Sequence, residues 1–175
     1  YLPFEEVLGR MGLSSLAEFS GTGFAAGTGP LVFEIAQLGT VLPLICYEAV
    51  FPQDVAYAPS RADVMVQLTN DAWFGNFSGP QQHLVKAQMR SIEQGVSLLR
   101  VANTGITGMI DPLGRLNYFL PLNKTGYIDV SVAKALPPTL YSRFGLWNVV
   151  IMVAMFSVFC IFCELSLRRV DAEKK

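Results

Sequence analysis

Apolar runs of strand length recur along the chain and are separated by short polar or glycine-rich segments. The clearest is Thr40–Cys46 (TVLPLIC), which is apolar almost throughout, the pattern of a strand buried on both faces. The other runs that we interpret as strands are Leu31–Ile35, Ala62–Thr69, Ser97–Ala102, Ile106–Ile110 and Tyr127–Val132. Strands interleaved with helical segments indicate an α/β sheet domain.

The best amphipathic segment is Pro80–Gln94, which we expect to form a helix. Pro80 suits the first turn of a helix and Gly95 suits its end. One face of this helix would be formed by Leu84, Ala87, Ser91 and Ile92. A shorter helix is expected over Phe51–Ala58, and Asp111–Gly114 is expected to be a turn, with proline second and glycine fourth.

The last long apolar run, Leu146–Cys163, carries no charged residue and reaches the length of a membrane-spanning helix. A buried core helix is the alternative interpretation. Tyr141 and Trp147 stand where an interfacial aromatic belt would lie. The run is followed by the cations Arg168, Arg169, Lys174 and Lys175. The positive-inside rule then predicts a cytoplasmic C-terminus and places residues 1–145 on the periplasmic side.

Composition narrows the classes of function. The 175 residues have a formal net charge of −1, which gives no support for a nucleic-acid partner. No ligand cluster or phosphate-binding glycine motif is present, so no metal or organic cofactor is expected. The three cysteines form no disulfide framework, and Cys160 and Cys163 are interpreted as packing residues. The chain starts at Tyr1 without a methionine, which we interpret as a cut within a longer protein.

Cys46 is the candidate for chemistry because it ends a buried strand, a common place for site residues in α/β sheets. A thiol with a neighbouring base acts as a nucleophile, whereas most free cysteines are small buried hydrophobes. In extended backbone Glu48 would share a face with Cys46. A solvated glutamate at the strand end is the alternative.

A loop of aromatic and polar residues follows the Ala62–Thr69 strand, and we expect a rim that recognises substrate to be formed there by Asn70, Asp71, Trp73 and Phe74. Of these, Asn70, Trp73 and Phe74 are the candidate substrate-binding residues. The only histidine is His83. A Cys46–His83–Asn103 arrangement would match the chain order of papain-like proteases, but the local signature around their cysteine is missing. His83 is therefore expected to be a surface or capping residue.

Four segments, in this order, resemble the apolipoprotein N-acyltransferase family of the nitrilase superfamily: LICYE, TNDAWFG, GPQQHLVKAQMRSIEQG and LLRVANTGITGMIDPLGR. The opening YLPFEE is similar to the family's GEY-x-P segment, with Tyr1 as its tyrosine. The terminal apolar run also fits, because the family ends in a transmembrane helix. The resemblance covers roughly residues 1–168.

The resemblance implies an α/β fold, a partial nitrilase-type αββα sandwich. Residues 1–140 would be the C-terminal part of the nitrilase-like domain, 146–166 a transmembrane helix and 167–175 a cytoplasmic tail. The implied location is the bacterial inner membrane, with the catalytic domain on the periplasmic side.

The implied reaction moves an acyl chain from a phospholipid to a cysteine thioester and then to the N-terminal diacylglyceryl-cysteine of an apolipoprotein. Carried over by motif, Cys46 is the nucleophile and Glu48 a supporting residue. Tyr47 would offer its backbone N–H to the thioester oxyanion. Trp73 and Phe74 match a mobile aromatic loop at the lipid entrance.

The family's general-base glutamate and its lysine both precede the GEY segment, so neither matches a residue of this chain. Lys86 lies within the expected helix and matches no catalytic motif. We therefore expect the 175-residue chain alone to be inactive and to fold poorly. A membrane-anchored nitrilase-type amidase, and a non-catalytic fragment with a structural Cys46, remain the alternatives.

Overall fold

A computed structural model describes residues 27–173, in which six strands form a single mixed sheet of order β1-β2-β3-β4-β5-β6. The expectations that fall on residues 1–26, including Tyr1, lie outside the described residues. The three central strands are parallel, and the outer pairs are antiparallel. The strands are β1 (Phe33–Ile35), β2 (Gly39–Ile45), β3 (Val64–Thr69), β4 (Ser97–Ala102), β5 (Thr107–Ile110) and β6 (Leu116–Leu120).

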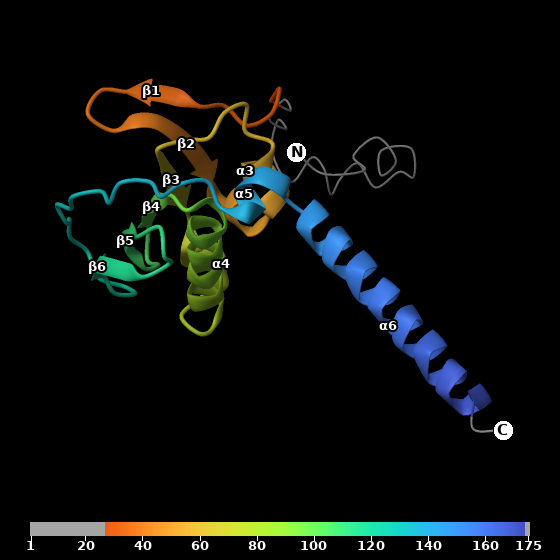
Figure 1. Cartoon of the computed structure of the whole chain (residues 1–175). Helices are drawn as coiled ribbons and strands as arrows, with labels where there is room; N and C mark the ends of the chain where they lie inside the picture. Colours follow the sequence, from red (N-terminus) through yellow and green to blue (C-terminus); the bar gives the residue numbers. More distant parts are fainter. Residues whose placement is uncertain (1–26, 174–175) are drawn as a thin grey trace, which may run out of the picture.

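Short helices make the crossovers between the parallel strands (Figure 1). The connection from β2 to β3 holds the 3₁₀ helix η1 (Cys46–Val50) and α3 (Pro52–Ala56). The connection from β3 to β4 holds the 3₁₀ helix η2 (Asp71–Phe74) and α4 (Gly79–Gln94). The chain then ends in α5 (Leu140–Phe144) and α6 (Trp147–Glu173).

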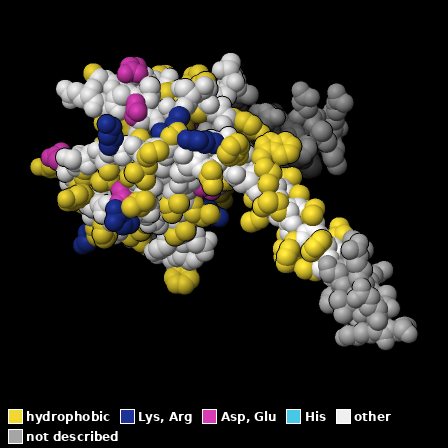
Figure 2. Space-filling view, viewed as in Figure 1, with side chains coloured by type: hydrophobic (Ala, Val, Ile, Leu, Met, Phe, Trp, Pro, Cys, Tyr) yellow, Lys and Arg dark blue, Asp and Glu magenta, His cyan; other side chains and the backbone are white. Residues whose placement is uncertain are grey.

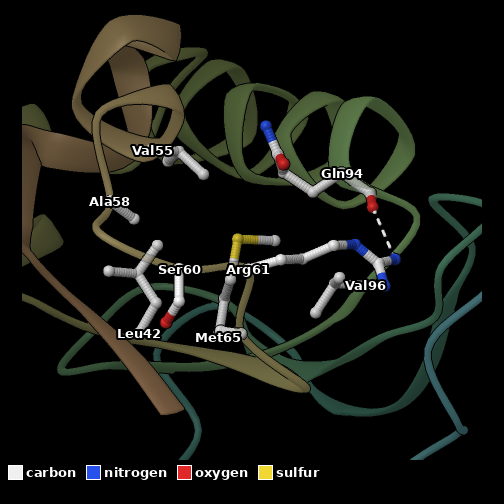
Figure 3. A pocket seen from close by; sticks show the side chains of 9 residues that line it. Leu42, Val55, Ala58, Ser60, Arg61, Met65, Gln94 and Val96 are labelled. Atoms are coloured by element: carbon white, nitrogen blue, oxygen red, sulfur yellow. Dashed lines mark hydrogen bonds between the residues drawn. The ribbon is translucent and has the colours of Figure 1, made fainter. Parts of the chain in front are cut away.

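The hydrophobic core lies between one face of the sheet and the covering helices. Its central members come from β2, β3 and β4 below and from α3 and α4 above: Leu42, Leu44, Met65, Leu98, Val55, Leu84 and Ala87. A small cavity remains between these layers (Figure 3). The Arg61 guanidinium lies at one side of it and donates to the Gln94 carbonyl oxygen at 3.0 Å. None of the candidate site residues lines this cavity.

The opposite face of the sheet is covered at one end, where Val41, Val64 and Ser97 are buried, but it is apolar and open at the carboxyl ends of the central strands. Ile45, Leu68 and Val101 pair across β2, β3 and β4, and their side chains are 55%, 49% and 51% exposed. A row of exposed aliphatic side chains on a central sheet is what a second packed layer would cover.

Most of the expected elements are confirmed, with two errors. Residues 127–132 form no strand, because they join no ladder. The strand that completes the sheet is instead β6, which follows the confirmed Asp111–Gly114 turn and pairs with β5. Ile92 was expected on the buried face of α4 but is 52% exposed, since it leans over the turn at Gly114.

Helix α6 projects away from the sheet (Figure 1), and the exposed side chains over its residues 147–162 are mostly hydrophobic (Figure 2). The window Trp147–Glu164 is long and apolar enough to cross a membrane by length and composition, and none of it is buried. Over the described residues, this apolar run is therefore not the buried core helix of the alternative interpretation.

Candidate active site

Cys46 lies where β2 turns sharply into η1. The strand ends at Ile45, one residue earlier than expected, and Cys46 has a φ of +52°. This left-handed conformation is uncommon for a residue with a side chain and costs of order 1–3 kcal/mol. The sharp turn leaves Cys46 half-buried and Tyr47 exposed at the carboxyl end of the central strands.

The expectation that Glu48 shares an extended face with Cys46 is wrong, because residues 46–50 form a 3₁₀ helix. The Glu48 carboxylate instead reaches back, and its Oε2 accepts from the Ile45 backbone N–H at 2.6 Å. Glu48 thereby fixes the backbone on the strand side of Cys46. Glu48 therefore lies in, and stabilises, the turn that carries the Cys46 thiol.

Beneath this turn lies a buried polar network. The expectation that Asp71 belongs to an exposed substrate rim is wrong, because its side chain is buried in this network. Gln67, Asp71, His83 and Arg100 are each at most 3% exposed. Arg100 Nη2 donates to Asp71 Oδ2 at 2.5 Å, and Arg100 Nη1 donates to Gln67 Oε1. The side-chain amide of Gln67 donates to the Cys46 carbonyl oxygen at 2.9 Å. The network therefore ends on the backbone of the candidate nucleophile.

The hydrogen bonds also fix the imidazole. Gln67 Oε1 accepts from Arg100, so the other end of the amide, Gln67 Nε2, is the donor that faces His83. His83 Nε2 lies 3.1 Å from it and therefore accepts the hydrogen bond. His83 Nδ1 then donates to Asp71 Oδ1 at 2.9 Å. The expectation of a surface or capping histidine is wrong, because His83 packs inside the domain.

Burial and charge oppose each other in the network. Burial alone would raise the pKa of Asp71, but the hydrogen bond from His83 and the charge of Arg100 outweigh it and hold this pKa below its ordinary value. Burial lowers the pKa of Arg100, and the Asp71 carboxylate opposes that change. The pair is therefore an ionised, buried salt bridge.

Aromatic rings join η1 to the η2 loop. The Tyr47 ring lies 5.6 Å from Phe51 and 6.4 Å from Phe74, and Phe74 meets His83 edge-on at 5.4 Å. Trp73 projects into solvent with 81% of its surface exposed. Trp73 and Phe74 thus differ: Phe74 is packed over the network, and Trp73 is free to meet a ligand.

Asn70 directly follows β3 and caps η2, where its Oδ1 accepts from the Ala72 N–H at 3.1 Å. This hydrogen bond shows that the Asn70 side chain acts as a cap of η2. Asn70 is thus the N-cap of the 3₁₀ helix that carries Trp73.

The papain-like arrangement is not formed by the described residues. Asn103 is exposed after β4, and the hydrogen bonds of His83 lead to Asp71 and Gln67. Over residues 27–173 there is also no cluster of three His, Cys, Asp or Glu side chains suited to a metal ion.

The missed network residues had a detectable signal. Gln67 and Arg100 interrupt apolar strands at positions that face the covering helices, and polar groups there need partners. Their pairing follows from the parallel register, in which Gln67 stands opposite Arg100.

Comparisons with known proteins show the family of this chain. The family model of the carbon-nitrogen hydrolases matches residues 4–136. The chain is 44% identical over 155 residues to the apolipoprotein N-acyltransferase of Bradyrhizobium diazoefficiens and covers 29% of that protein. It is 41% identical over 155 residues to the apolipoprotein N-acyltransferase of Rhodopseudomonas palustris, again covering 29%. In both cases 89% of this chain is aligned.

Among solved structures, a mutant amidase from Nesterenkonia sp. AN1, with acrylamide added to its active-site cysteine, is similar with a TM-score of 0.53. The sequence identity is 18%, and the match covers 74% of this chain and 51% of the amidase, so it shows the fold alone. The chain spans less than a third of the length of the two curated relatives. On the family match and the shared fold, the chain belongs to the carbon-nitrogen hydrolase family.

Proposed function

We propose that this chain is part of an N-acyltransferase that carries an acyl group as a thioester on Cys46. The observation that supports this most is the presentation of Cys46 in a strained turn at the carboxyl end of the central strands. The naming of the relatives as apolipoprotein N-acyltransferases points the same way. The acyl donor would be a phospholipid, and the acceptor the amino group of a lipoprotein's N-terminal diacylglyceryl-cysteine.

The proposed chemistry has two halves. In the first, the Cys46 thiolate attacks the ester carbonyl carbon of the donor; a carbon–sulfur bond forms, and the lysophospholipid leaves as an alcohol after taking a proton. In the second, the acceptor amine attacks the thioester; a carbon–nitrogen bond forms, the carbon–sulfur bond breaks, and the amine proton passes to a base. We assign that base and a lysine to the family segments that precede this part of the domain.

Each half passes through an oxyanion that needs hydrogen-bond donors. Tyr47 lies in the first turn of η1, where backbone N–H groups have no acceptor within the helix. Its N–H is directly adjacent to the nucleophile in the chain. We assign it to the oxyanion and assign Glu48 to holding the turn from the other side.

Two apolar features support a lipid substrate over a small soluble amide. The exposed ring of Trp73 stands on the loop beside the Tyr47–Phe74 cluster, which suits contact with an acyl chain. Helix α6 would hold the domain at the bilayer surface, where both lipid-linked substrates reside.

The proposed location is the inner membrane of a bacterium, with the sheet domain in the periplasm. Cysteine labelling tests this orientation in intact cells. In a Cys46→Ala background, which removes the native thiol of the sheet domain, Lys124→Cys should react with a membrane-impermeant maleimide from outside the inner membrane, and Lys175→Cys only after lysis. Reaction of both before lysis, or the reverse pattern, would contradict the assigned topology.

Transfer is tested with a radiolabelled phospholipid and a synthetic diacylglyceryl-cysteine peptide, added to the intact protein that carries these residues. Label should move to the peptide, and the transfer should vanish in Cys46→Ala. Release of free fatty acid or of ammonia from short amides, without transfer to the peptide, would favour the amidase alternative.

A further inference from the structure

We propose that Gln67 is a positioning residue that aims the Tyr47 N–H at the reacting carbonyl by holding the Cys46–Tyr47 peptide plane. The inference rests on the proposed function, in that it takes Cys46 as the nucleophile. Gln67 touches neither substrate nor thiol in this account. It acts through the backbone between the two residues.

The contact is specific. Gln67 Nε2 donates to the Cys46 carbonyl oxygen at 2.9 Å. That oxygen and the Tyr47 N–H belong to one planar peptide unit and point in opposite directions from it. An anchor on the carbonyl oxygen therefore also sets the direction of the N–H. Without the anchor, rotation of this plane would swing the N–H away from the oxyanion.

The peptide needs such an anchor because Cys46 is left-handed, with a φ of +52°. A residue with a side chain persists in this conformation only when its surroundings enforce it. Glu48 restrains the strand side of the turn through the Ile45 N–H at 2.6 Å. Gln67 restrains the helix side, so the turn is held from both directions.

The Gln67 amide cannot flip without losing its partners. Its Oε1 accepts from Arg100 Nη1, and the other guanidinium nitrogen is held by Asp71 Oδ2 at 2.5 Å. A flipped amide would bring N–H groups against Arg100 and its oxygen against the Cys46 carbonyl oxygen. The ion pair thus determines which end of the amide faces the nucleophile.

The test uses Gln67→Glu in the intact protein. The carboxylate keeps an acceptor for Arg100 but removes the donor to the Cys46 carbonyl oxygen and to His83 Nε2. The matched control is Gln88→Glu, the same change at an amide that donates to the Gly114 carbonyl oxygen at 2.8 Å, away from the site. If the melting temperature of Gln67→Glu shows that this variant does not fold, it is replaced by Gln67→Met, which lacks both the donor and the charge.

Two reactions of the same thiol separate positioning from a general structural effect. Acyl-enzyme formation from phospholipid passes through an oxyanion, so its single-turnover rate should fall roughly 10- to 100-fold in Gln67→Glu. Alkylation of Cys46 by iodoacetamide forms no oxyanion, so its rate should stay within about threefold of wild type. Gln88→Glu should match wild type in both reactions.

A third measurement keeps this inference separate from the proposed function. The carbonyl ¹³C resonance of labelled Cys46 reports its hydrogen bond and should shift in Gln67→Glu but not in Gln88→Glu. Equal acylation rates in the two variants, an unmoved resonance, or an equal loss of alkylation would overturn the positioning role. If wild type forms no acyl-enzyme, the proposed function fails, and the resonance alone decides whether Gln67 holds the turn.

Discussion

The guanidinium of Arg100 and the carboxylate of Asp71 form an ion pair that is buried completely, with 2.5 Å between Nη2 and Oδ2. Arg100 comes from β4, and Asp71 from the loop after β3. Gly105 packs so closely on this carboxylate that a Cβ there would lie 2.3 Å from Oδ2. The pair thus ties β4 to η2 directly under the candidate nucleophile.

Breaking this pair should destabilise the domain strongly. Arg100→Met leaves the Asp71 charge buried without its partner, a loss of about 3–5 kcal/mol in the free energy of unfolding. The control is Arg115→Met, which removes an ion pair whose arginine side chain is 69% exposed and should cost less than about 1 kcal/mol. Thermal unfolding of the two variants measures the difference. Equal shifts in melting temperature would contradict the buried pair.

Stability should fall on the acid side of neutrality. Asp63 has a pKa held below its usual value chiefly by the backbone N–H of Thr40, and the pKa of Asp71 is also lowered. Because these carboxyls bind protons more weakly in the folded state, their stabilisation is present above the ordinary aspartate pKa of about 3.9 and is lost as pH falls through the lowered values. A melting temperature that stays constant from neutral pH down to about pH 3 would contradict this.

Glu48→Ala should lower activity more than stability. The substitution removes the acceptor of the Ile45 N–H, which loosens the turn that holds Cys46, but Glu48 is exposed, so the expected loss of unfolding free energy is below about 1 kcal/mol. Glu48→Gln keeps an oxygen acceptor and should retain much more of the acylation rate. The comparison is made by single-turnover kinetics, and identical losses in the two variants would exclude a role for this hydrogen bond.

Trp73→Ala should leave the fold intact and weaken use of the lipid donor. Trp73 is 81% exposed, so its truncation should change stability by less than about 0.5 kcal/mol while the KM for phospholipid rises. Tyr127, an aromatic residue that is 86% exposed outside this loop, provides the control Tyr127→Ala. A rise in KM of the same size in both variants would remove the special role of Trp73.

The uncovered face of the sheet should pack against a second layer in the intact protein. Leu68→Asp would place a charge in the middle of the Ile45–Leu68–Val101 row and should cost several kcal/mol despite the 49% exposure of Leu68 here. Leu113→Asp alters a leucine that is 58% exposed in a turn and should be tolerated. The measurement is the melting temperature of each variant of the intact protein. Equal melting temperatures for Leu68→Asp and Leu113→Asp would argue that this face of the sheet stays exposed to solvent.

Sequence patterns were sufficient for the elements whose signal is local. β2, β4 and α4 follow from apolar runs and from helical spacing with Pro80 and Gly95 at the ends. Cys46 stood out because it follows a buried run. β6 was missed because its apolar residues gain a ladder only through pairing with β5, and residues 127–132 show a similar pattern without a partner.

The interior of the candidate site could not be derived from such patterns. The left-handed turn at Cys46 has no glycine to mark it, so nothing local indicated that Glu48 would fold back to Ile45. Gln67 and Arg100 are far apart in sequence, and only the parallel register brings them together. The buried network is therefore a product of topology.

The most direct test of the central claim is the intact mass of the protein after incubation with a phospholipid of defined acyl chain and no acceptor. The account predicts an adduct of the mass of one acyl group on Cys46, released by hydroxylamine and absent in Cys46→Ala. A folded, membrane-embedded protein that stays at its unmodified mass would contradict the thioester and, with it, the acyltransferase proposal.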